Sequence, residues 1–355
     1  MARSVENQQG RIESYDVHGG KIVVFGDLHV SSIFSGQHKH YLTECYENMD
    51  RMTDIVQKEK ASAVIFLGDL VGVNEKAIRD RQVLMRFMMF LSMLNKVTDG
   101  NVYSVKGNHD CGDFTDFDLL CGLGLIKNPE YINYYGRRPG SRKDDGLEVR
   151  FHLVNYGDEN RKLKLTDPAV GASDIVLGHN EYTIAGVTNW YSKGQGIELS
   201  SLSNFCGVSM VVSGHIHQPS EEILYTTMKD GNPIGLFYTG APGRVIERFD
   251  DCWYFTFWYD ESDGVWSTLY NAELFGLQPA SEVFYDSSEF VGEDEDDERS
   301  QRLEQSNKLT DIVKEIMESR LTSGDLNRQI DIVPGVSPEV KAIAKKYLEL
   351  ATSGK

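Results

Sequence analysis

The chain lacks the features that would place it in a membrane or in a disulfide-linked secreted frame. No apolar run approaches the roughly 18 residues that a membrane helix needs, and the first twenty residues contain no apolar signal region. The five cysteines are odd in number and show no CxxC spacing, which indicates free thiols in a reducing compartment. We therefore expect a cytoplasmic protein with no membrane contact.

Acidic residues outnumber basic residues. Lys plus Arg total 36 against 54 for Asp plus Glu, so the formal net charge is -18. A chain this acidic does not coat a nucleic acid or an anionic membrane by bulk electrostatics. Eight of the carboxylates fall in residues 286–298, DSSEFVGEDEDDE, which hold no basic residue. We interpret this stretch as a solvated, self-repelling linker.

Short apolar runs alternate with helical patterns in the first hundred residues. Residues 21–25, 63–67 and 101–105 indicate strands, and residues 41–60 and 77–97 show the apolar face of a helix. This β-α-β-α-β order implies parallel strands with right-handed crossovers. Further strands are predicted at 150–154, 174–177, 209–212, 223–228, 236–240 and 253–259, with a hairpin turn at 229–232. The fold class predicted is α/β, with two mixed β-sheets packed face to face and flanking helices.

The chain is long enough for about two domains. We expect a polar leader at 1–19, a main domain at 20–260, a connecting segment at 261–298 that ends in the acidic linker, and a helical pair at 299–355. Apolar residues at helical steps, from Leu309 to Leu321 and from Val340 to Leu348, predict the two helices of that pair. Two short helices cover each other only in part, so the pair is a candidate docking element. An isolated tail or a contact between two copies is the alternative.

One pattern recurs five times: an apolar strand, then Gly, then a side chain that can bind a metal. It occurs in VVFGDLH, IFLGD, YSVKGNHD, IVLGHN and VVSGHIH. The glycines allow a sharp turn, and in open α/β sheets the carboxyl ends of the strands face a common crevice. Each motif alone could be an ordinary turn, but together they favour a metal site. The side chains expected to converge are Asp27, His29, Asp69, Asn108, His109, His179, His215 and His217.

The donor types indicate which ions would bind. With His109 set aside, the set has two aspartates, one asparagine and four histidines. This mixture suits manganese, iron or zinc better than calcium or magnesium. Seven ligands are too many for one ion and fit two ions that share a carboxylate. Two ions about 3.5–4 Å apart can hold a phosphate between them for in-line hydrolysis of a phosphoester. We therefore predict two divalent ions, with manganese preferred over iron or zinc.

These motifs resemble those of the calcineurin-like metallophosphoesterase superfamily, D-x-H, G-D, G-N-H-[DE], G-H and G-H-x-H, over residues 22–217. The resemblance implies a four-layer sandwich. It also implies that Asp27, His29 and His217 hold the first ion, that Asn108, His179 and His215 hold the second, and that Asp69 bridges the two. By the same resemblance His109 is the proton donor to the leaving oxygen, or stabilises its charge, and Asp110 orients the imidazole.

Within the superfamily the chain is most similar to the SbcD-type double-strand-break repair nucleases. Protein Ser/Thr phosphatases carry Gly after D-x-H and Asp-Arg-Gly after the second Asp, whereas Val30 and Leu70 stand at the corresponding positions here. The phosphate-binding Arg of that branch is therefore missing. The GNHD motif with Asp110, and the turn at residues 240–242 after the last histidine motif, are similar to the nuclease branch. An ordinary hairpin turn would also account for residues 240–242.

The same resemblance implies a DNA substrate and an SbcC-like coiled-coil ATPase bound through residues 299–355, with a homodimer as a further arrangement. A Gly/Pro loop between aromatics carries four cations that could contact phosphates, namely Arg137, Arg138, Arg142 and Lys143. A solvated loop is the alternative.

SbcD-like nucleases usually carry a capping domain, but only some 25 residues separate Asp260 from the linker. A clamp around duplex DNA is therefore not expected, and a substrate smaller than duplex DNA is the alternative.

We predict a two-metal-dependent phosphodiesterase, a DNA exo/endonuclease of the SbcD-like type that works in DNA repair, recombination or DNA processing with an SbcC-like ATPase. The alternative is a stand-alone metallophosphoesterase that hydrolyses a nucleotide or another small phosphoester. A third hypothesis is a scaffold that keeps the fold without catalysis. The filled ligand positions and His109 argue against it, since a scaffold needs neither.

Overall fold

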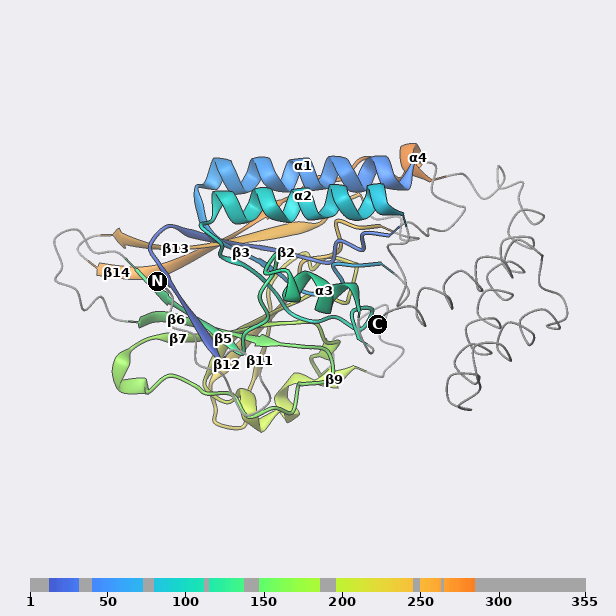
Figure 1. The fold of residues 1–355 in the computed structure, drawn as a ribbon. Helices are drawn as coiled ribbons and strands as arrows, with labels where there is room; N and C mark the ends of the chain where they lie inside the picture. Colours follow the sequence, from blue (N-terminus) through green and yellow to red (C-terminus); the bar gives the residue numbers. More distant parts are fainter. Residues whose placement is uncertain are drawn as a thin grey trace, which may run out of the picture. The chain divides into compact units, whose positions relative to one another are not determined.

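Two β-sheets pack face to face in the computed structural model (Figure 1). The structure describes residues 13–31, 40–72, 80–111, 115–136, 147–185, 196–244, 250–262 and 265–284. One sheet has the strand order β1 (Ser14–His18), β5 (Tyr131–Tyr135), β6 (Leu147–Val154), β7 (Ser173–Gly178), β10 (Val208–Ser213), β12 (Pro233–Tyr238) and β11 (Leu224–Thr227). The other has the order β14 (Val265–Leu274), β13 (Trp253–Ser262), β2 (Lys21–Phe25), β3 (Ala61–Phe66) and β4 (Val102–Ser104). A short parallel pair, β8 (Tyr182–Thr183) and β9 (Ile197–Glu198), lies apart from both.

Both sheets are mixed, which confirms the predicted fold class. Strands β2, β3 and β4 are parallel neighbours, as the β-α-β-α-β order requires, and β13 pairs with β2 in the antiparallel sense. Strands β6, β7, β10 and β12 are parallel in the larger sheet, while β11 forms the predicted hairpin with β12. The parallel strands of each sheet supply the chain turns that carry the sequence motifs.

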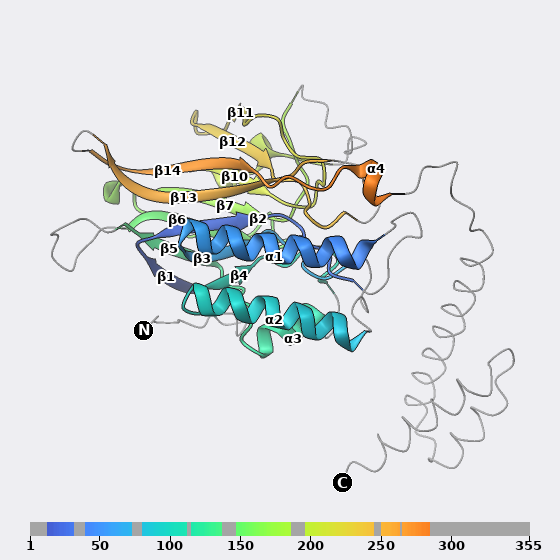
Figure 2. The ribbon, with the colours of Figure 1, turned by 90° about the horizontal axis from the view of Figure 1, so that it is seen from above.

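Helices α1 (Tyr41–Glu59) and α2 (Arg81–Val97) cover the outer face of the smaller sheet (Figures 1 and 2). Helix α2 begins at Asp80, whose carboxylate accepts the N–H of Gln82 and so satisfies one unpaired backbone donor of the first turn. Helix α1 ends at Lys60 in the left-handed conformation. A short helix, α3 (Asp116–Gly122), adds Phe117 and Leu120 to the same apolar cluster.

The strand that begins the first motif is buried on both of its faces. Val23 and Phe25 of β2 pack under the helices, while Ile22 and Val24 pack against the larger sheet. Successive side chains of a strand point to opposite faces, so a strand between two apolar layers has no polar positions. This explains why residues 22–25, IVVF, are continuously apolar.

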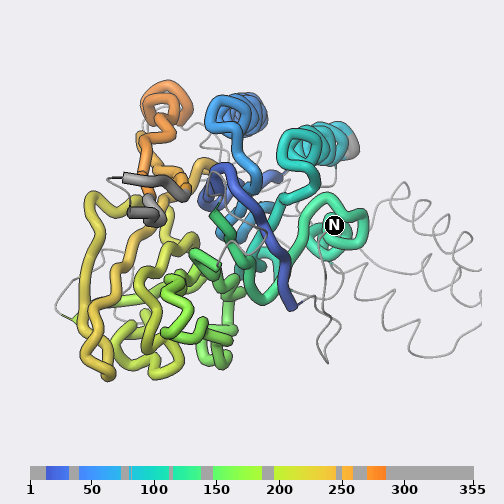
Figure 3. The backbone as a smooth tube through the Cα atoms, turned by 90° about the vertical axis from the view of Figure 1, so that its left-hand side faces the viewer, coloured from blue at the N-terminus to red at the C-terminus, as the bar shows by residue number. Residues whose placement is uncertain are grey.

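Short turns and loops cover the outer face of the larger sheet (Figure 3). In the described residues, the 3-10 turns Leu199–Ser201 and Ser203–Phe205 pack there, together with Leu202 and other apolar side chains. The sandwich is nevertheless four layers deep, because these turns and loops bury an apolar cluster as the helices do on the other side.

The folded region begins earlier and ends later than the boundaries expected at residues 20 and 260. Strand β1 lies within the expected leader, where Tyr15 and Val17 alternate with polar residues and are buried at the sheet edge. Strand β14 extends the sheet beyond the expected end by pairing with β13 along its length. The chain divides into two units after Asp286, and the linker and helical pair lie outside the described residues.

The five cysteines lie in the described residues and are free thiols, as their spacing predicted. Cys45 and Cys252 are buried, where a thiol packs as a small apolar group. No helix of the described residues combines the length and the hydrophobicity that crossing a bilayer requires.

Candidate metal centre

Each of the seven predicted ligands follows the carboxyl end of a strand. Asp27 and His29 follow β2, Asp69 follows β3, Asn108 follows β4, His179 follows β7, and His215 and His217 follow β10. The first three of these strands belong to the smaller sheet and the last two to the larger one. The structure brings all seven side chains together where the two sheets meet, in two adjoining clusters.

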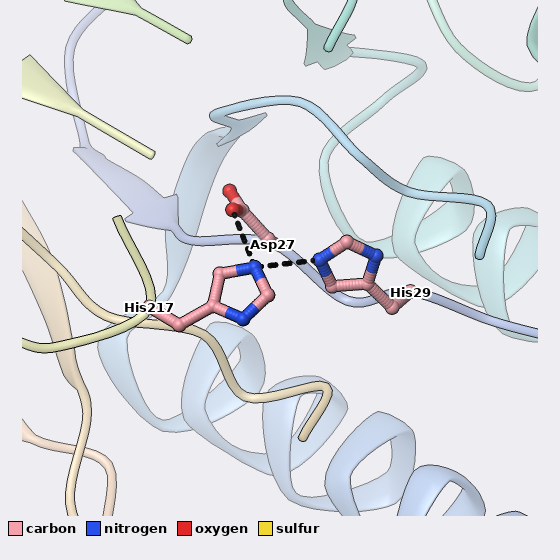
Figure 4. A group of neighbouring side chains, drawn as sticks. All are labelled: Asp27, His29 and His217. Carbon is pink, nitrogen blue, oxygen red and sulfur yellow. Dashed lines mark hydrogen bonds and ion pairs between the residues drawn. The ribbon is translucent and has the colours of Figure 1, made fainter. Parts of the chain in front are cut away.

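The first cluster consists of Asp27, His29 and His217, whose ligand atoms lie within 4.8 Å of one another (Figure 4). The Nε2 atoms of the two histidines are 2.9 Å apart, and Asp27 Oδ2 is 3.7 Å from His217 Nε2. Ligands about 2.1 Å from an ion lie about 3 Å from each other when their bonds meet at a right angle. These separations therefore suit one divalent ion.

The second cluster consists of Asp69, His179 and His215, again with ligand atoms within 4.8 Å. Asn108 joins it, because its Oδ1 lies 2.9 Å from both His179 Nε2 and His215 Nδ1. Two imidazoles, an amide oxygen and a carboxylate make a donor set of the kind expected for manganese, iron or zinc.

Asp69 lies between the two clusters. Its Oδ2 is 3.1 Å from His179 Nε2 in the second cluster and 4.0 Å from His29 Nε2 in the first. Its other oxygen, Oδ1, accepts the backbone N–H of His109 at 2.9 Å, which fixes the orientation of the carboxylate. One oxygen is thus directed toward both clusters, as the bridging role requires.

The surroundings of the His179 ring suit a cation. His179 Nδ1 is 2.7 Å from the carbonyl oxygen of Leu67 and donates to it, so its Nε2 faces the oxygens of Asp69 and Asn108. Both of those atoms are acceptors, and Nε2 can satisfy them only as N–H. Burial disfavours the imidazolium, but the charges of Asp27 and Asp69 raise the pKa of His179 well above its ordinary value. A metal ion would take the place of that proton.

The other buried histidines are held neutral. Burial, followed by the nearby His217, lowers the pKa of His29 to about 4. Burial, followed by the charge of His179, lowers the pKa of His215 to about 4. Neutral imidazole is the form that binds a metal. These two side chains are therefore ready to act as ligands at neutral pH.

Three ligands occupy strained backbone conformations. His29, Asp69 and His215 have φ values of 50°, 42° and 71°, among only five non-glycine residues with positive φ in the described chain. Such conformations cost of the order of 1–3 kcal/mol each and tend to gather at functional sites, where the surroundings fix them. The concentration at the ligands indicates that the fold maintains this geometry at some expense in stability.

Two glycines of the motifs are required by close approach. A Cβ atom on Gly107 would lie 2.1 Å from Asp69 Oδ1, and one on Gly214 would lie 2.2 Å from Asp27 Oδ1. Any side chain at either position would displace a carboxylate of the site. The recurrent glycine before the polar residue therefore makes room for the ligands as well as for the turn.

His109 lies beside the clusters without joining either. Its half-buried ring is 5.5 Å from that of His29, centroid to centroid. Asp110 was expected to orient the imidazole of His109, but its carboxylate bonds elsewhere. Its Oδ2 accepts the backbone N–H of Gly107 at 3.0 Å. Burial, followed by the charge of Asp69, raises the pKa of Asp110 to about 7. Asp110 therefore stabilises the turn that presents Asn108 and His109, and acts on them through the backbone.

The turn at residues 240–242 is part of the support for the first cluster. The N–H of Gly243 donates to the carbonyl oxygen of Asp27 at 3.0 Å, and Asn48 of α1 donates to that of Pro242 at 2.8 Å. Arg244 is buried, pairs with Glu44 of α1 and donates to the carbonyl oxygen of Gln278. Sequence reasoning missed this anchor, whose signal was an arginine two residues after the turn.

Tyr156 is a second residue that sequence reasoning missed. It follows β6, is 45% exposed, and its ring lies 5.6 Å from that of His215 and 6.3 Å from that of His179. No ligand motif includes it, and the only signal was its place in a loop after a strand of the larger sheet. The cations expected to contact phosphates, Arg137, Arg138, Arg142 and Lys143, lie outside the described residues.

A match to a protein-family model supports the assignment made from the ligands. The model of the calcineurin-like phosphoesterase family matches residues 20–219. A dimetal phosphatase from Danio rerio is similar in structure, with 12% identity, a TM-score of 0.41, and coverage of 73% of this chain and 99% of that one. A predicted phosphoesterase from Streptococcus pneumoniae has 12% identity, a TM-score of 0.28, and coverage of 71% and 98%. No curated protein sequence matches the chain.

Metal uptake by the metal-free protein is expected to release protons at neutral pH, because the ion displaces the proton of His179. His29 and His215, with pKa values of about 4, release none. Metal affinity should therefore fall as the pH falls below the raised pKa of His179. Calorimetry in buffers of different ionisation enthalpy measures the number of protons released. In the metal-free protein the raised pKa of His179 also stabilises the fold. This contribution is complete below about pH 6.5, the ordinary pKa of histidine, and is lost as the pH rises through the raised pKa of His179. Zero protons released would contradict the assignment of His179 as a ligand.

Proposed function

Since the chain belongs to the calcineurin-like phosphoesterase family and is a metal-dependent phosphoesterase, we propose that it is a two-metal phosphodiesterase of the SbcD-like nuclease type. The observation that carries the proposal is the position of Asp69. Its Oδ2 faces His179 of one cluster at 3.1 Å and His29 of the other at 4.0 Å. Two ion sites that share one carboxylate are the arrangement that in-line hydrolysis of a phosphoester uses.

The roles of the protein groups follow from their positions. Two divalent ions, when bound, supply positive charge that stabilises the phosphate oxygens and makes water a nucleophile at neutral pH. Asp69, whose Oδ1 accepts the backbone N–H of His109, holds the two ligand sets in a fixed relative position. His109 binds in neither cluster, so its imidazole is free to donate a proton to the leaving oxygen.

The nuclease branch is favoured by features of the motifs. The phosphate-binding Arg of protein Ser/Thr phosphatases is missing after Asp69. The turn at residues 240–242 follows the last histidine motif, as in SbcD-like nucleases. The carbonyl oxygen of Pro242 accepts from Asn48, and the N–H of the next residue, Gly243, donates to the carbonyl oxygen of Asp27. We propose a DNA substrate, manganese as the metal and an SbcC-like ATPase bound through residues 299–355. A small phosphoester is the rival substrate, because the segment after Asp260 is too short for a capping domain.

Substrate preference is tested with the full chain and Mn²⁺. Labelled single-stranded and duplex DNA are incubated beside bis-p-nitrophenyl phosphate, with the Asp69→Asn variant as the inactive control. Cleavage of DNA supports the nuclease. Cleavage of the small ester alone would favour the rival substrate. Deletion of residues 299–355 should spare hydrolysis of the small ester and abolish capture of an SbcC-like ATPase, and loss of both would refute a separate docking element.

Tyr156→Ala is expected to raise the KM for a DNA oligonucleotide by about 5- to 150-fold with a smaller change in kcat, because stacking of a base on an aromatic ring contributes about 1–3 kcal/mol. The exposed ring beside His215 provides such a platform. Tyr156→Phe keeps the ring and should retain the KM of the natural protein. Tyr225→Ala removes an exposed tyrosine of the edge strand β11 and is the matched control. Equal effects of the Ala and Phe changes would show that stacking is not involved.

A further inference from the structure

The tyrosine beside the second cluster lies in a tight turn of the chain. Residues 155–158 form this turn, which is closed by a hydrogen bond of 3.0 Å from the N–H of Asp158 to the carbonyl oxygen of Asn155. Gly157 has a φ of 81°, a left-handed conformation that favours glycine at the third position of a turn, so the chain reverses directly after Tyr156. The turn by itself does not determine where the Tyr156 ring lies relative to the metal centre.

One buried side chain bonds to the turn on both sides of Tyr156. Asn180 is 2% exposed, and its Nδ2 donates to the carbonyl oxygen of Asn155 at 3.2 Å. Its Oδ1 accepts the N–H of Gly157 at 3.1 Å. A side-chain amide carries both a donor and an acceptor, so a single residue satisfies the backbone before the tyrosine and the backbone after it.

Asn180 is itself fixed by the strand that leads to another ligand. The Oγ of Ser213, at the end of β10, accepts the backbone N–H of Asn180 at 3.2 Å and lies 2.9 Å from its carbonyl oxygen. Asn180 directly follows His179, and Ser213 stands two residues before His215. The amide that holds the turn therefore has a fixed position relative to the two histidines that Tyr156 faces.

A second set of hydrogen bonds joins the turn to the end of β4. The N–H of Tyr156 donates to the carbonyl oxygen of Lys106 at 2.8 Å, and the N–H of Lys106 donates to Asn155 Oδ1 at 2.8 Å. Lys106 stands two residues before the ligand Asn108. The backbone of Tyr156 is thus held between strand ends that carry three ligands of the second cluster.

We propose that Asn180 is a positioning residue, which holds the ring of Tyr156 beside the second cluster as a fixed surface for an aromatic group of the substrate. The ring is 45% exposed and lies 5.6 Å from that of His215. A ring that is fixed before binding loses little conformational freedom when a base stacks on it. None of the described hydrogen bonds of the Asn180 side chain reaches a metal ligand, so its effect is on substrate binding. The inference rests on the proposed function, because a DNA base is the aromatic group considered.

The test compares Asn180→Leu with the natural full chain and Mn²⁺ on two single-stranded oligonucleotides of equal length, one with bases and one fully abasic. Leucine is close to asparagine in size but has neither a donor nor an acceptor. The KM for the strand with bases should rise by about 5-fold or more, toward the value for Tyr156→Ala, with a smaller change in kcat. The KM for the abasic strand should not change, because it offers phosphates but no ring. In a Tyr156→Ala background Asn180→Leu should add nothing, since a positioning residue acts only through the ring it positions.

Amide hydrogen exchange gives a readout that needs no DNA. Asn180→Leu removes the acceptor of the Gly157 N–H, so exchange in residues 155–158 should become faster while the metal content stays that of the natural protein. Asn180→Ser is the second variant if the leucine does not fold, because serine is too short to reach both sides of the turn.

Asn204→Leu is the matched control. The amide of Asn204 donates to the carbonyl oxygens of Glu159 and Arg161, both at 2.8 Å, in the same loop but beyond the turn. Its loss removes two hydrogen bonds to the loop and none to the residues beside Tyr156, so the KM for both strands should stay that of the natural protein.

Three outcomes would overturn the inference. Equal rises in KM for the two strands would show that Asn180 acts on the metal centre in general. Unchanged exchange and KM would show that the turn keeps its place without the amide. A further rise in KM in the double variant would show that Asn180 acts other than through Tyr156.

Failure of the natural chain to cleave DNA would refute the proposed function and leave a separate test of Asn180. Bis-p-nitrophenyl phosphate carries rings that can stack in the same way. Its KM should rise in both Asn180→Leu and Tyr156→Ala, and a KM that rises only in Tyr156→Ala would exclude the positioning role.

Discussion

His109→Ala is expected to keep both metal ions and to lose turnover by about 10²–10⁴-fold, the usual contribution of a general acid. The structure places the ring beside His29 but in neither ligand cluster, so its removal should not change metal affinity. The loss should be largest for a substrate with a poor leaving group, which needs a proton most. The measurement is kcat for an alkyl and a p-nitrophenyl ester, with metal content determined on the same samples.

The matched control for that variant is His18→Ala. His18 is an exposed histidine of β1 that stacks on Tyr135 and touches no ligand. Loss of a metal from His109→Ala would show that His109 is a ligand. Equal turnover of the two variants on the poor leaving group would remove the acid role.

Asp69→Asn is expected to weaken both ions together, which no other single ligand change should do. A unit charge about 4 Å from another contributes about 4 kcal/mol at an effective dielectric constant of 20, and direct ligation is closer still. The affinity for each ion should therefore fall by roughly 10³-fold or more, and turnover should fall to the background. His217→Ala and His215→Ala should each affect the ion of one cluster only.

Asp174→Asn is the matched control for the loss of a buried carboxylate. Asp174 pairs with His152 at 2.7 Å and accepts from Thr166, in neither metal cluster. Burial raises the pKa of Asp174, but its bonds to His152 and Thr166 lower it overall, so the group stabilises the fold at neutral pH and less in acid. The control should lose stability without losing metal. If Asp69→Asn keeps one ion at full affinity, Asp69 does not bridge.

The sequence predicted the structure best at positions where a single physical requirement determines the residue type. Gly followed by Asp, Asn or His at the end of an apolar strand needs a tight turn, and five such turns predicted the meeting of seven ligands. Continuous apolar runs such as residues 22–25 predicted buried strands, because both faces of β2 are covered. These features are local, and the rule that parallel strands share an edge extended them to three dimensions.

The rest depends on contacts that local patterns do not contain. Strand β1 lies in the segment expected to be a polar leader, because its alternation of Tyr15 and Val17 with polar residues is a weak signal by itself and the strand is fixed by pairing with β5. Asp110 stands next to His109 in the sequence, yet its carboxylate turns back to the N–H of Gly107. Tyr156 reaches the centre through the packing of a loop, and no spacing from the ligands encodes that position.

The central claim is that two ions sharing Asp69 perform the hydrolysis, and the most direct measurement follows metal content and rate together. Metal-free protein is titrated with Mn²⁺ while bound ion and the rate of bis-p-nitrophenyl phosphate hydrolysis are recorded at each step. The account predicts binding of two ions per chain, with the rate rising only as the second ion binds. A full rate at one ion per chain, or a rate that does not depend on added metal, would contradict it.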